Sequence, residues 1–294
     1  MGALKKLIPG PLKKAIKKAV SPTIVAPSEY RLVTEDGGRL GEMRVLVTGA
    51  SGGIGSAIVH RLLVEGAVVG ACARSEEKLA PLRKGFEREG LLHDDNLVSL
   101  VLDVTDDESV RAGIGSFVER CGGIDALVNN AGGSARDRAK PFVEQDFSVL
   151  DEIVSLNLRG SMFCAHEVAK ALVAQGEGGR IINMSSVVGM RGARGMCDYA
   201  AAKEGVVGFT RSLAIELGEK SITVNCVSPG MVSQTAGEYT YVMRETAGNC
   251  LGRMGGTDEV ARLVAYLLSP DADYITGQNL VIDGGRTLGL MGSW

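Results

Sequence analysis

The sequence predicts an α/β fold: one doubly wound domain with a seven-stranded parallel sheet, preceded by a basic N-terminal extension. From residue 43 onward, short apolar runs alternate with segments of helical periodicity, which is typical of parallel strands covered by helices on both faces. A glycine-rich turn follows the first apolar run directly, and no stretch is left over for a second domain. We therefore expect residues 43–294 to form the folded domain and residues 1–42 the extension.

The predicted strands are apolar runs bounded by turn residues. They lie at 43–50, 67–74, 96–104, 125–132, 179–186, 222–230 and 277–285. The predicted helices carry apolar residues three or four positions apart. They lie at 55–66, 75–89, 106–120, 146–175, 196–218 and 258–269. Residues 231–256 have no clear period, which makes them the candidate lid over a site.

The N-terminal extension differs from the rest of the chain in charge. It contains six lysines before residue 20 and no acidic residue before Glu29. From Pro11 its apolar residues follow helical spacing, so one interpretation is a short basic amphipathic helix that contacts a membrane surface or an acidic partner. The alternative is a poorly ordered leader, or a helix on the protein's own surface. Residues 30–42 resemble a small hairpin, and Met43 is an alternative functional start.

Composition excludes several classes of protein. Hydrophobic residues make up 45% of the chain and charged residues 23%, which are ordinary proportions for a folded domain. The net charge of -3 gives no reason to expect nucleic-acid binding. The six cysteines form no C-x-x-C pair, so we expect reduced, mostly buried thiols and no structural metal. No apolar run approaches the roughly 18 residues of a transmembrane helix, so a cytoplasmic protein is expected.

The turn after the first strand carries a nucleotide-binding pattern. Its sequence TGASGGIG, residues 48–55, is a spacing variant of the dinucleotide fingerprint of Rossmann domains. Glycine permits positive φ there and lets the backbone approach a pyrophosphate at a helix N-terminus. A plain tight turn is the alternative, but the strand–turn–helix context favours nucleotide binding. The expected contacts are Gly49, Ser51, Gly52, Gly53, Ile54 and Gly55.

The ends of the next strands indicate which nucleotide binds. Ala73 stands where an NAD site usually has an acid, and Arg74 follows, which favours NADP(H) over NAD(H) because a guanidinium suits a 2′-phosphate. Arg74 could instead be a solvated surface charge. Asp103 and Val104 would lie beside an adenine ring, although Asp103 could also cap the next turn. The NNAG motif would contact the nucleotide through Asn130, Ala131 and Gly132, unless its asparagines only satisfy local backbone.

Four polar residues follow in a fixed order. Asn157 stands in SLNLRG, Ser186 in INMSS, Tyr199 thirteen residues later, and Lys203 four residues after that. With TGASGGIG and NNAG, these motifs resemble the short-chain dehydrogenase/reductase family over about residues 44–285, and most of all its 3-oxoacyl-(acyl-carrier-protein) reductase type. The resemblance implies an NAD(P)-dependent oxidoreductase that interconverts a ketone and a secondary alcohol by hydride transfer.

The resemblance also implies a role for each residue. Tyr199 would be the general acid or base, with its pKa lowered from about 10 by the charge of Lys203. Lys203 would also hold the nicotinamide ribose, Ser186 would bind the carbonyl oxygen, and Asn157 would bend its helix and hold a water. Taken singly, Ser186 could merely cap a helix, Asn157 be an ordinary helix residue, and Tyr199 serve in packing. Further nucleotide contacts are implied for Tyr199, Lys203, Pro229, Gly230 and Val232.

The substrate, the partners and one cofactor contact stay open. Gln234 stands where the family often has a threonine that contacts the nicotinamide amide. We expect a small-molecule or acyl-thioester substrate. Arg191 and Arg194, just before Tyr199, could receive its carboxylate or phosphate, or they could be solvated loop charges. The small-residue face of the helix at 196–218 and the C-terminal strand resemble the assembly surfaces of the family, which implies a homo-oligomer, a dimer or a tetramer. The rival interpretations are a nucleotide-binding regulator without turnover and a tethered protein acting through residues 1–42.

Overall fold

The computed structural model describes residues 38–93, 95–134, 136–233 and 248–289. Within them, seven parallel strands form one sheet in the order β3-β2-β1-β4-β5-β6-β7, which confirms the predicted doubly wound α/β domain. The expected N-terminal helix, most of the hairpin expected at 30–42, the centre of the candidate lid at 231–256, and Gln234 lie outside the described residues.

Each predicted strand is present and is shorter than its apolar run. The strands are β1 (Arg44–Thr48), β2 (Val68–Ala73), β3 (Leu97–Val101), β4 (Ala126–Asn129), β5 (Gly179–Met184), β6 (Ile222–Pro229) and β7 (Asn279–Ile282). The helices are α2 (Gly53–Val64), α3 (Glu76–Arg88), α4 (Asp107–Cys121), α5 (Phe147–Val154), α6 (Gly160–Gln175), α7 (Val187–Arg191), α8 (Cys197–Leu217) and α10 (Thr257–Leu268). Of these, α7 was not predicted, because one and a half turns leave little periodicity to detect.

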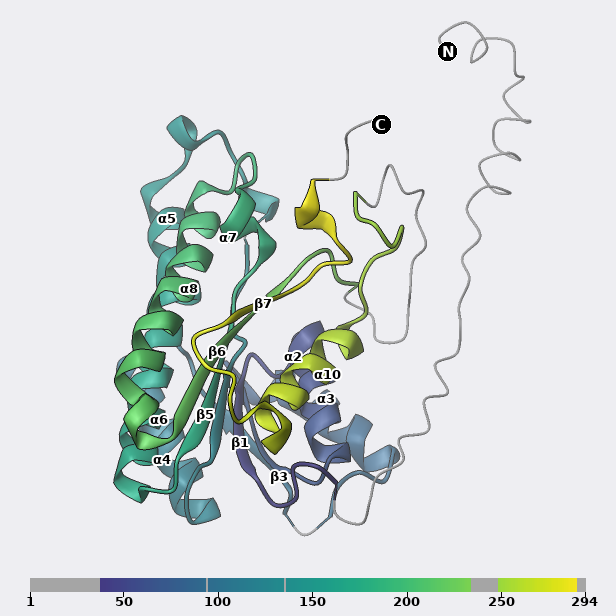
Figure 1. The fold of residues 1–294 in the computed structure, drawn as a ribbon, viewed down its shortest axis with the longest axis vertical. Helices are drawn as coiled ribbons and strands as arrows, with labels where there is room; N and C mark the ends of the chain where they lie inside the picture. Colours follow the sequence, from purple (N-terminus) through teal and green to yellow (C-terminus); the bar gives the residue numbers. More distant parts are fainter. Residues whose placement is uncertain (1–37, 94, 135, 234–247, 290–294) are drawn as a thin grey trace, which may run out of the picture.

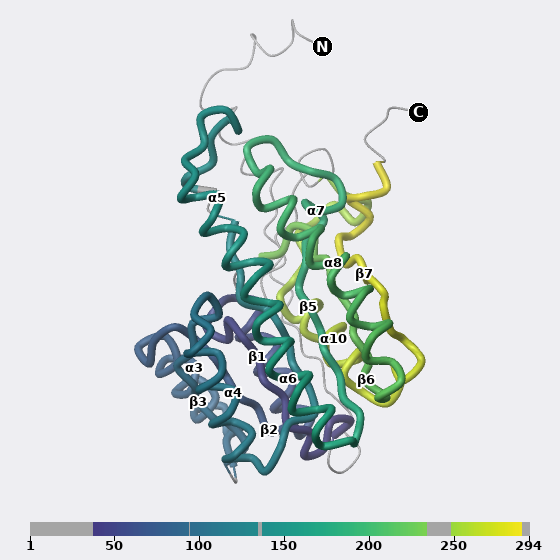
Figure 2. Tube along the Cα trace, turned by 90° about the vertical axis from the view of Figure 1, so that its left-hand side faces the viewer, coloured from purple at the N-terminus to yellow at the C-terminus, as the bar shows by residue number. Residues whose placement is uncertain are grey.

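The helices cover the sheet on both faces. Figure 1 shows α4, α6 and α8 on one side of the strands and α2, α3 and α10 on the other, and Figure 2 shows α6 and α8 running along the same face. In β1, Val45 and Val47 belong to the core under α2 and α10, whereas Leu46 belongs to the core under α4 and α6. Burial on both faces explains why the strands are continuous apolar runs. No described helix is long and apolar enough to cross a membrane.

The helix predicted at 146–175 contains an irregularity at one functional candidate. The structure has α5 and α6 joined by five residues of π-helix, Ser155–Arg159, with Asn157 at their centre. A π segment inside an α-helix adds one residue to a turn and is frequent at functional sites. Its effect here is to place Asn157, which is fully buried, against the loop that follows β4.

A short segment ahead of β1 packs as part of the domain. Leu40 is 2% exposed, and its N–H donates to the Glu65 carbonyl at 3.0 Å. Arg39 donates to both carboxylate oxygens of the buried Glu65, at 3.0 and 2.7 Å, and Arg61 pairs with the same carboxylate. The packed part of the domain therefore includes Arg39 and Leu40, ahead of the boundary predicted at residue 43.

Candidate functional site

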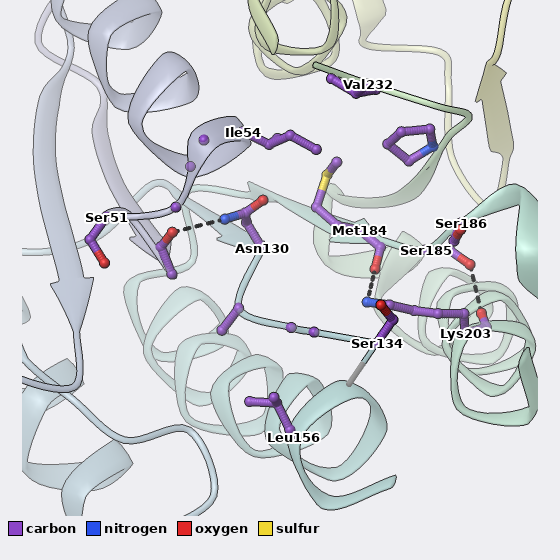
Figure 3. Close-up of a pocket in the computed structure, with 18 of the residues that line it drawn as sticks. Ser51, Ile54, Asn130, Ser134, Leu156, Met184, Ser185, Ser186, Lys203 and Val232 are labelled. Carbon is purple, nitrogen blue, oxygen red and sulfur yellow. Dashed lines mark hydrogen bonds between the residues drawn. The ribbon is translucent and has the colours of Figure 1, made fainter. Parts of the chain in front are cut away.

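A cavity of about 630 Å³ opens at the carboxyl ends of the central strands. β1 and β4 are neighbours in the sheet although they are not consecutive in the chain, so their following connections leave toward opposite faces. A crevice opens at such a point, and ligands of open α/β sheets bind there. Figure 3 shows the cavity between the turn after β1, the loop after β4, and the residues at the ends of β5 and α8.

The glycine-rich turn forms one end of this cavity. Gly49 has a φ of 65°, in the region that favours glycine, and a Cβ on it would lie 2.8 Å from the Ala131 Cα. A Cβ on Gly55 would lie 2.1 Å from the Gly49 carbonyl oxygen. α2 begins at Gly53, and its N-cap Gly52 has no side chain to occupy the N–H groups of the first turn. Those N–H groups and the helix dipole suit a phosphate.

The loop after β4 is fastened to the turn after β1. Asn130 donates from Nδ2 to the carbonyls of Thr48 and Gly49, both at 3.1 Å, and the Thr48 Oγ1 accepts from the N–H groups of Asn130 and Ala131, both at 3.0 Å. The side chain of Asn130 therefore satisfies backbone groups, the second of the two roles open to it from sequence. In doing so it fixes the distance between the two walls of the cavity.

The end of the cavity predicted to receive the adenosine carries positive charge. Ala73 ends β2 and is buried, and the exposed side chains of Arg74 and Lys78 line the cavity beside it. Val104 lines the cavity as expected. Asp103 does not, because its Oδ1 accepts from the N–H and the Oγ1 of Thr105, at 2.9 and 2.7 Å. Asp103 thus caps its own turn, as the alternative role proposed from sequence would require.

Tyr199 and Lys203 lie one turn apart in α8 at the other end of the cavity. The Lys203 Nζ is 5.8 Å from the centroid of the Tyr199 ring and donates to the Met184 carbonyl at 2.8 Å. Lys203 is only 3% exposed, and this burial lowers its pKa from 10.5 to about 8, slightly opposed by the Cys226 thiol. Within the described part of the chain, no carboxylate pairs with Lys203, so its charge is held by a carbonyl dipole alone.

Ser186 and Asn157 approach the same region by different routes. The Oγ of Ser186 accepts from the Val188 N–H at 3.2 Å, so this residue caps α7 while it lines the cavity. Asn157 does not form part of the cavity wall. Its Oδ1 accepts from the Gly133 N–H at 3.1 Å, and its Nδ2 donates to the carbonyls of Gly133 and Ile153 at 2.8 and 2.9 Å. Its amide therefore fixes the loop after β4 beside Lys203, where a Cβ on Gly132 would lie 3.2 Å from the Lys203 Nζ.

The cavity brings together most of the predicted residues. They are Gly49, Ser51, Gly52, Gly53, Ile54, Gly55, Arg74, Val104, Asn130, Ala131, Gly132, Ser186, Tyr199, Lys203, Pro229, Gly230 and Val232. Sequence reasoning missed Lys78, Met184, Ser185 and Met254, which also line it. Lys78 could have been found, because it stands in the first turn of α3, which begins two residues after Arg74. Met254 gave no such signal, since it follows a segment without periodicity.

Comparison with known proteins gives one consistent family. A family model described as Enoyl-(Acyl carrier protein) reductase matches residues 49–287. The 3-oxoacyl-(acyl-carrier-protein) reductase FabG of Vibrio harveyi is 39% identical over 246 residues, which cover 82% of this chain and 95% of that protein. The FabG of Thermotoga maritima is also 39% identical over 246 residues, covering 83% of this chain and 97% of its own length.

Solved structures agree in fold over the same region. A short-chain type dehydrogenase/reductase from Mycobacterium marinum superposes with a TM-score of 0.76 at 32% identity, covering 84% of this chain and 96% of that one. A short-chain alcohol dehydrogenase from Sinorhizobium meliloti superposes with the same TM-score at 33% identity, covering 85% and 98%. A shared sequence pattern, a shared fold and a nucleotide-type cavity thus lead to one conclusion: this chain is an NAD(P)-dependent oxidoreductase of the short-chain dehydrogenase/reductase family.

Proposed function

We propose that the enzyme is an NADP(H)-dependent carbonyl reductase that converts 3-oxoacyl thioesters to 3-hydroxyacyl thioesters. The observation that carries the proposal is the buried ammonium of Lys203, one helical turn from the Tyr199 ring and beside Ser186. A cation in this position stabilises a phenolate and so brings the proton affinity of a tyrosine into the range that acid–base catalysis needs. The names of the curated relatives support the choice of a 3-oxoacyl group.

The residues present suit a dinucleotide. The N–H groups at the start of α2 would hold its diphosphate, and Lys203 would donate to the hydroxyls of its nicotinamide ribose. When bound, the nicotinamide supplies the hydride. Tyr199 donates its hydroxyl proton to the substrate carbonyl oxygen, and Ser186 donates a hydrogen bond to the same oxygen and orients it. In the oxidative direction Tyr199 takes the proton back.

The charge at the adenosine end favours NADP(H). Arg74 and Lys78 are exposed cations in the cavity wall, and Ala73 leaves no acid at the end of β2 to accept from a ribose 2′-hydroxyl. Two cations in the cavity wall, with no acid at the end of β2, suit a 2′-phosphate. We expect the double variant Arg74→Ala, Lys78→Ala to weaken NADPH binding far more than NADH binding in a fluorescence titration. Arg83→Ala on the same helix, where Arg83 pairs with Glu87, is the matched control.

The catalytic end of the cavity suits an acyl substrate. The side chains of Leu156, Met231 and Met254 line it together with Tyr199, and apolar walls with few polar groups are typical of small-molecule sites. In the loop after β4, Arg138 pairs with Glu152 and Lys140 with Asp146. The exposed side chains of Arg191 and Arg194 would instead meet the phosphate of a carrier or of coenzyme A. Either thioester would therefore serve as a substrate.

Assembly into a homo-oligomer, a dimer or a tetramer, is part of the proposal. Phe147, Met162 and Ile215 expose large apolar side chains on α5, α6 and α8, with exposed fractions of 84%, 42% and 83%. Large apolar side chains exposed on a helical layer favour association when a second copy covers them. Sedimentation equilibrium of the full chain would give a multiple of the monomer mass if this surface is covered by a second copy.

A substrate panel and one matched pair of variants test the proposed activity. NADPH oxidation is measured with 3-oxoacyl thioesters, 2-enoyl thioesters and unrelated ketones at equal concentrations. We expect the 3-oxoacyl thioesters to react fastest, and Tyr199→Phe to lower kcat roughly 10²- to 10⁴-fold. Tyr274→Phe, at a fully exposed tyrosine, should leave kcat unchanged. Faster turnover of enoyl thioesters, or full activity of Tyr199→Phe, would contradict the proposal.

A further inference from the structure

Three consecutive residues at the end of β5 each form one hydrogen bond with α8. Asn183 donates from Nδ2 to the Thr210 Oγ1 at 2.9 Å, and Ser185 donates from Oγ to the Lys203 carbonyl at 2.7 Å. Between them, the Met184 carbonyl accepts from the Lys203 Nζ at 2.8 Å. Figure 3 shows the latter two bonds on either side of Lys203. We call Asn183, Met184 and Ser185 the β5 clamp.

The alternation of the strand and the period of the helix explain why these groups meet. Asn183 and Ser185 stand two positions apart, so their side chains point to the same face of the sheet, the one covered by α8. Thr210 follows Lys203 by seven residues, which is two turns along the same side of α8. The clamp therefore holds the helix at two heights, about 10 Å apart along its axis.

The clamp and its partners on α8 are all buried. The exposed fractions are 0% for Asn183, 4% for Met184 and 5% for Ser185, and 3% for Lys203 and 1% for Thr210. A buried polar group that loses its partner is costly, so these bonds strongly favour one position of α8. From the other side, α7 packs closely on the same turn, where a Cβ on Gly189 would lie 2.9 Å from the Glu204 N.

The clamp is also connected to the helix that carries Asn157. The Oδ1 of Asn183 accepts from the Asn129 Nδ2 at 2.9 Å, and the same Nδ2 donates to the Ser161 carbonyl at 2.9 Å. Ser161 in turn donates from Oγ to the Asn157 carbonyl at 3.2 Å. One buried chain of hydrogen bonds thus joins α8, which carries Tyr199 and Lys203, through β5 and β4 to the π segment, which carries Asn157.

We propose that Asn183 and Ser185 are positioning residues, which fix the height and rotation of α8 so that the Lys203 ammonium stays buried beside Tyr199. The inference rests on the proposed function, because it assigns these two residues a role in the same proton transfer. Neither touches the reacting atoms: each acts on Lys203 through α8. Cys226 of β6 is the titratable group that faces Lys203 from the neighbouring strand, and it is fully buried. Loss of the clamp therefore changes the hydration of Lys203 but leaves Cys226, its titratable neighbour, in place.

The test uses small substitutions that remove side-chain hydrogen bonds between the clamp and α8. Ser185→Ala removes the bond to the Lys203 carbonyl. Thr210→Val removes the acceptor of Asn183 and also the bond from Thr210 to the Val206 carbonyl, and Thr210→Ser restores both. Ser228→Ala is the control, because Ser228 is fully buried and donates to the Asn279 Oδ1 at 2.7 Å, on the far side of β6. For each variant, kcat, the KM for NADPH, the pH profile of kcat and the melting temperature are measured on the full chain.

We expect Ser185→Ala and Thr210→Val to lower kcat roughly tenfold to a hundredfold, as a shift of about 1 Å in a catalytic group can do, with little change in KM. Their alkaline limb should move to higher pH as water reaches Lys203, and Thr210→Ser should restore both readouts. The positioning role is overturned if kcat and pH profile stay as in the wild type, or if Ser228→Ala with an equal melting temperature lowers kcat as much. Full activity of Tyr199→Phe would instead overturn the proposed function.

Discussion

The two edges of the sheet hold their charges in opposite ways. At the amino ends of the strands, Arg44 donates from Nε and Nη2 to both oxygens of Asp125, at 2.9 and 2.6 Å, and Arg39 binds Glu65 in the same two-pronged manner. At the carboxyl ends, Lys203 is more deeply buried than either arginine, and it has no carboxylate partner among the described residues.

This difference indicates that the paired arginines serve stability, whereas the buried lysine serves catalysis. An arginine paired with a carboxylate cannot change its charge near neutrality and contributes to stability through charge-assisted hydrogen bonds. A buried lysine without an acid is held close to its point of titration at a cost in stability. We infer that the paired charges of the amino edge stabilise the fold. The carboxyl edge tolerates a buried cation because the tyrosine beside it needs a fixed positive charge.

The largest effect is expected for Lys203→Met. Loss of the cation should lower kcat roughly 10²- to 10⁴-fold, as for removal of other acid–base groups. At neutral pH the variant should nevertheless be more stable, by up to about 3 kcal/mol, because each pKa unit is worth about 1.4 kcal/mol and the shift runs from 10.5 to about 8.

The sign of this effect can be checked with pH. The folded wild type binds the Lys203 proton less tightly than the unfolded chain, so its stability should rise as the pH rises from about 8 to 10.5. Lys203→Met should lack this rise in urea unfolding at the two pH values. Lys220→Met, at an exposed lysine, is the control. A variant that is inactive and also less stable at both pH values would show that Lys203 serves packing.

Truncation of the chain probes the amino edge. Removing residues 1–42 takes away Leu40 and leaves Glu65 with Arg61 alone, which should destabilise the domain by about 3 kcal/mol: roughly 2 for the buried leucine and about 1 for the ion pair. Removing residues 1–37 retains these contacts and is the matched control. Equal melting temperatures for the two truncations would contradict the packing of residues 38–42. The specific activity of the folded molecules should be the same in both.

A smaller effect is expected for Arg44→Met. The variant leaves the half-buried carboxylate of Asp125 without its guanidinium, so we expect a loss of about 2 kcal/mol at pH 7 with kcat within about twofold of the wild type. Burial alone raises the pKa of Asp125, but the hydrogen bonds and charge of Arg44 outweigh it and lower the pKa below 3.8. The contribution of this pair is therefore complete above that value and is lost as the pH falls through the lowered pKa.

Arg83→Met is the comparison for Arg44→Met. Arg83 forms an exposed pair with Glu87 one turn along α3, and exposed pairs contribute only about 0 to 1 kcal/mol. Unfolding in urea at about pH 7 and about pH 3 measures both variants. If Arg44→Met were no less stable than Arg83→Met, the Arg44–Asp125 pair would contribute no more to the free energy of unfolding than an exposed ion pair.

The sequence predicts the strands and their order along the chain better than the positions of individual side chains in the site. The apolar runs and the glycine turn predict all seven strands and their common carboxyl edge, because burial on both faces leaves a continuous pattern. The π turn at Asn157 leaves no such pattern, since one added residue hardly changes the period of a long helix. Ser185 was missed for another reason: its partner is a backbone carbonyl eighteen residues away, which no local motif encodes. Leu40 was missed because it stands alone before the first strand.

The charge state of Lys203 is the central claim, and the pH dependence of hydride transfer tests it most directly. Single-turnover reduction of a 3-oxoacyl thioester by bound NADPH is followed from about pH 6 to about pH 10, a range in which an ordinary lysine stays protonated. We predict that the rate falls as the pH rises through about 8, where Lys203 loses its proton. A rate that stays constant up to about pH 10 would contradict the account, because Lys203 would then be an ordinary, hydrated lysine.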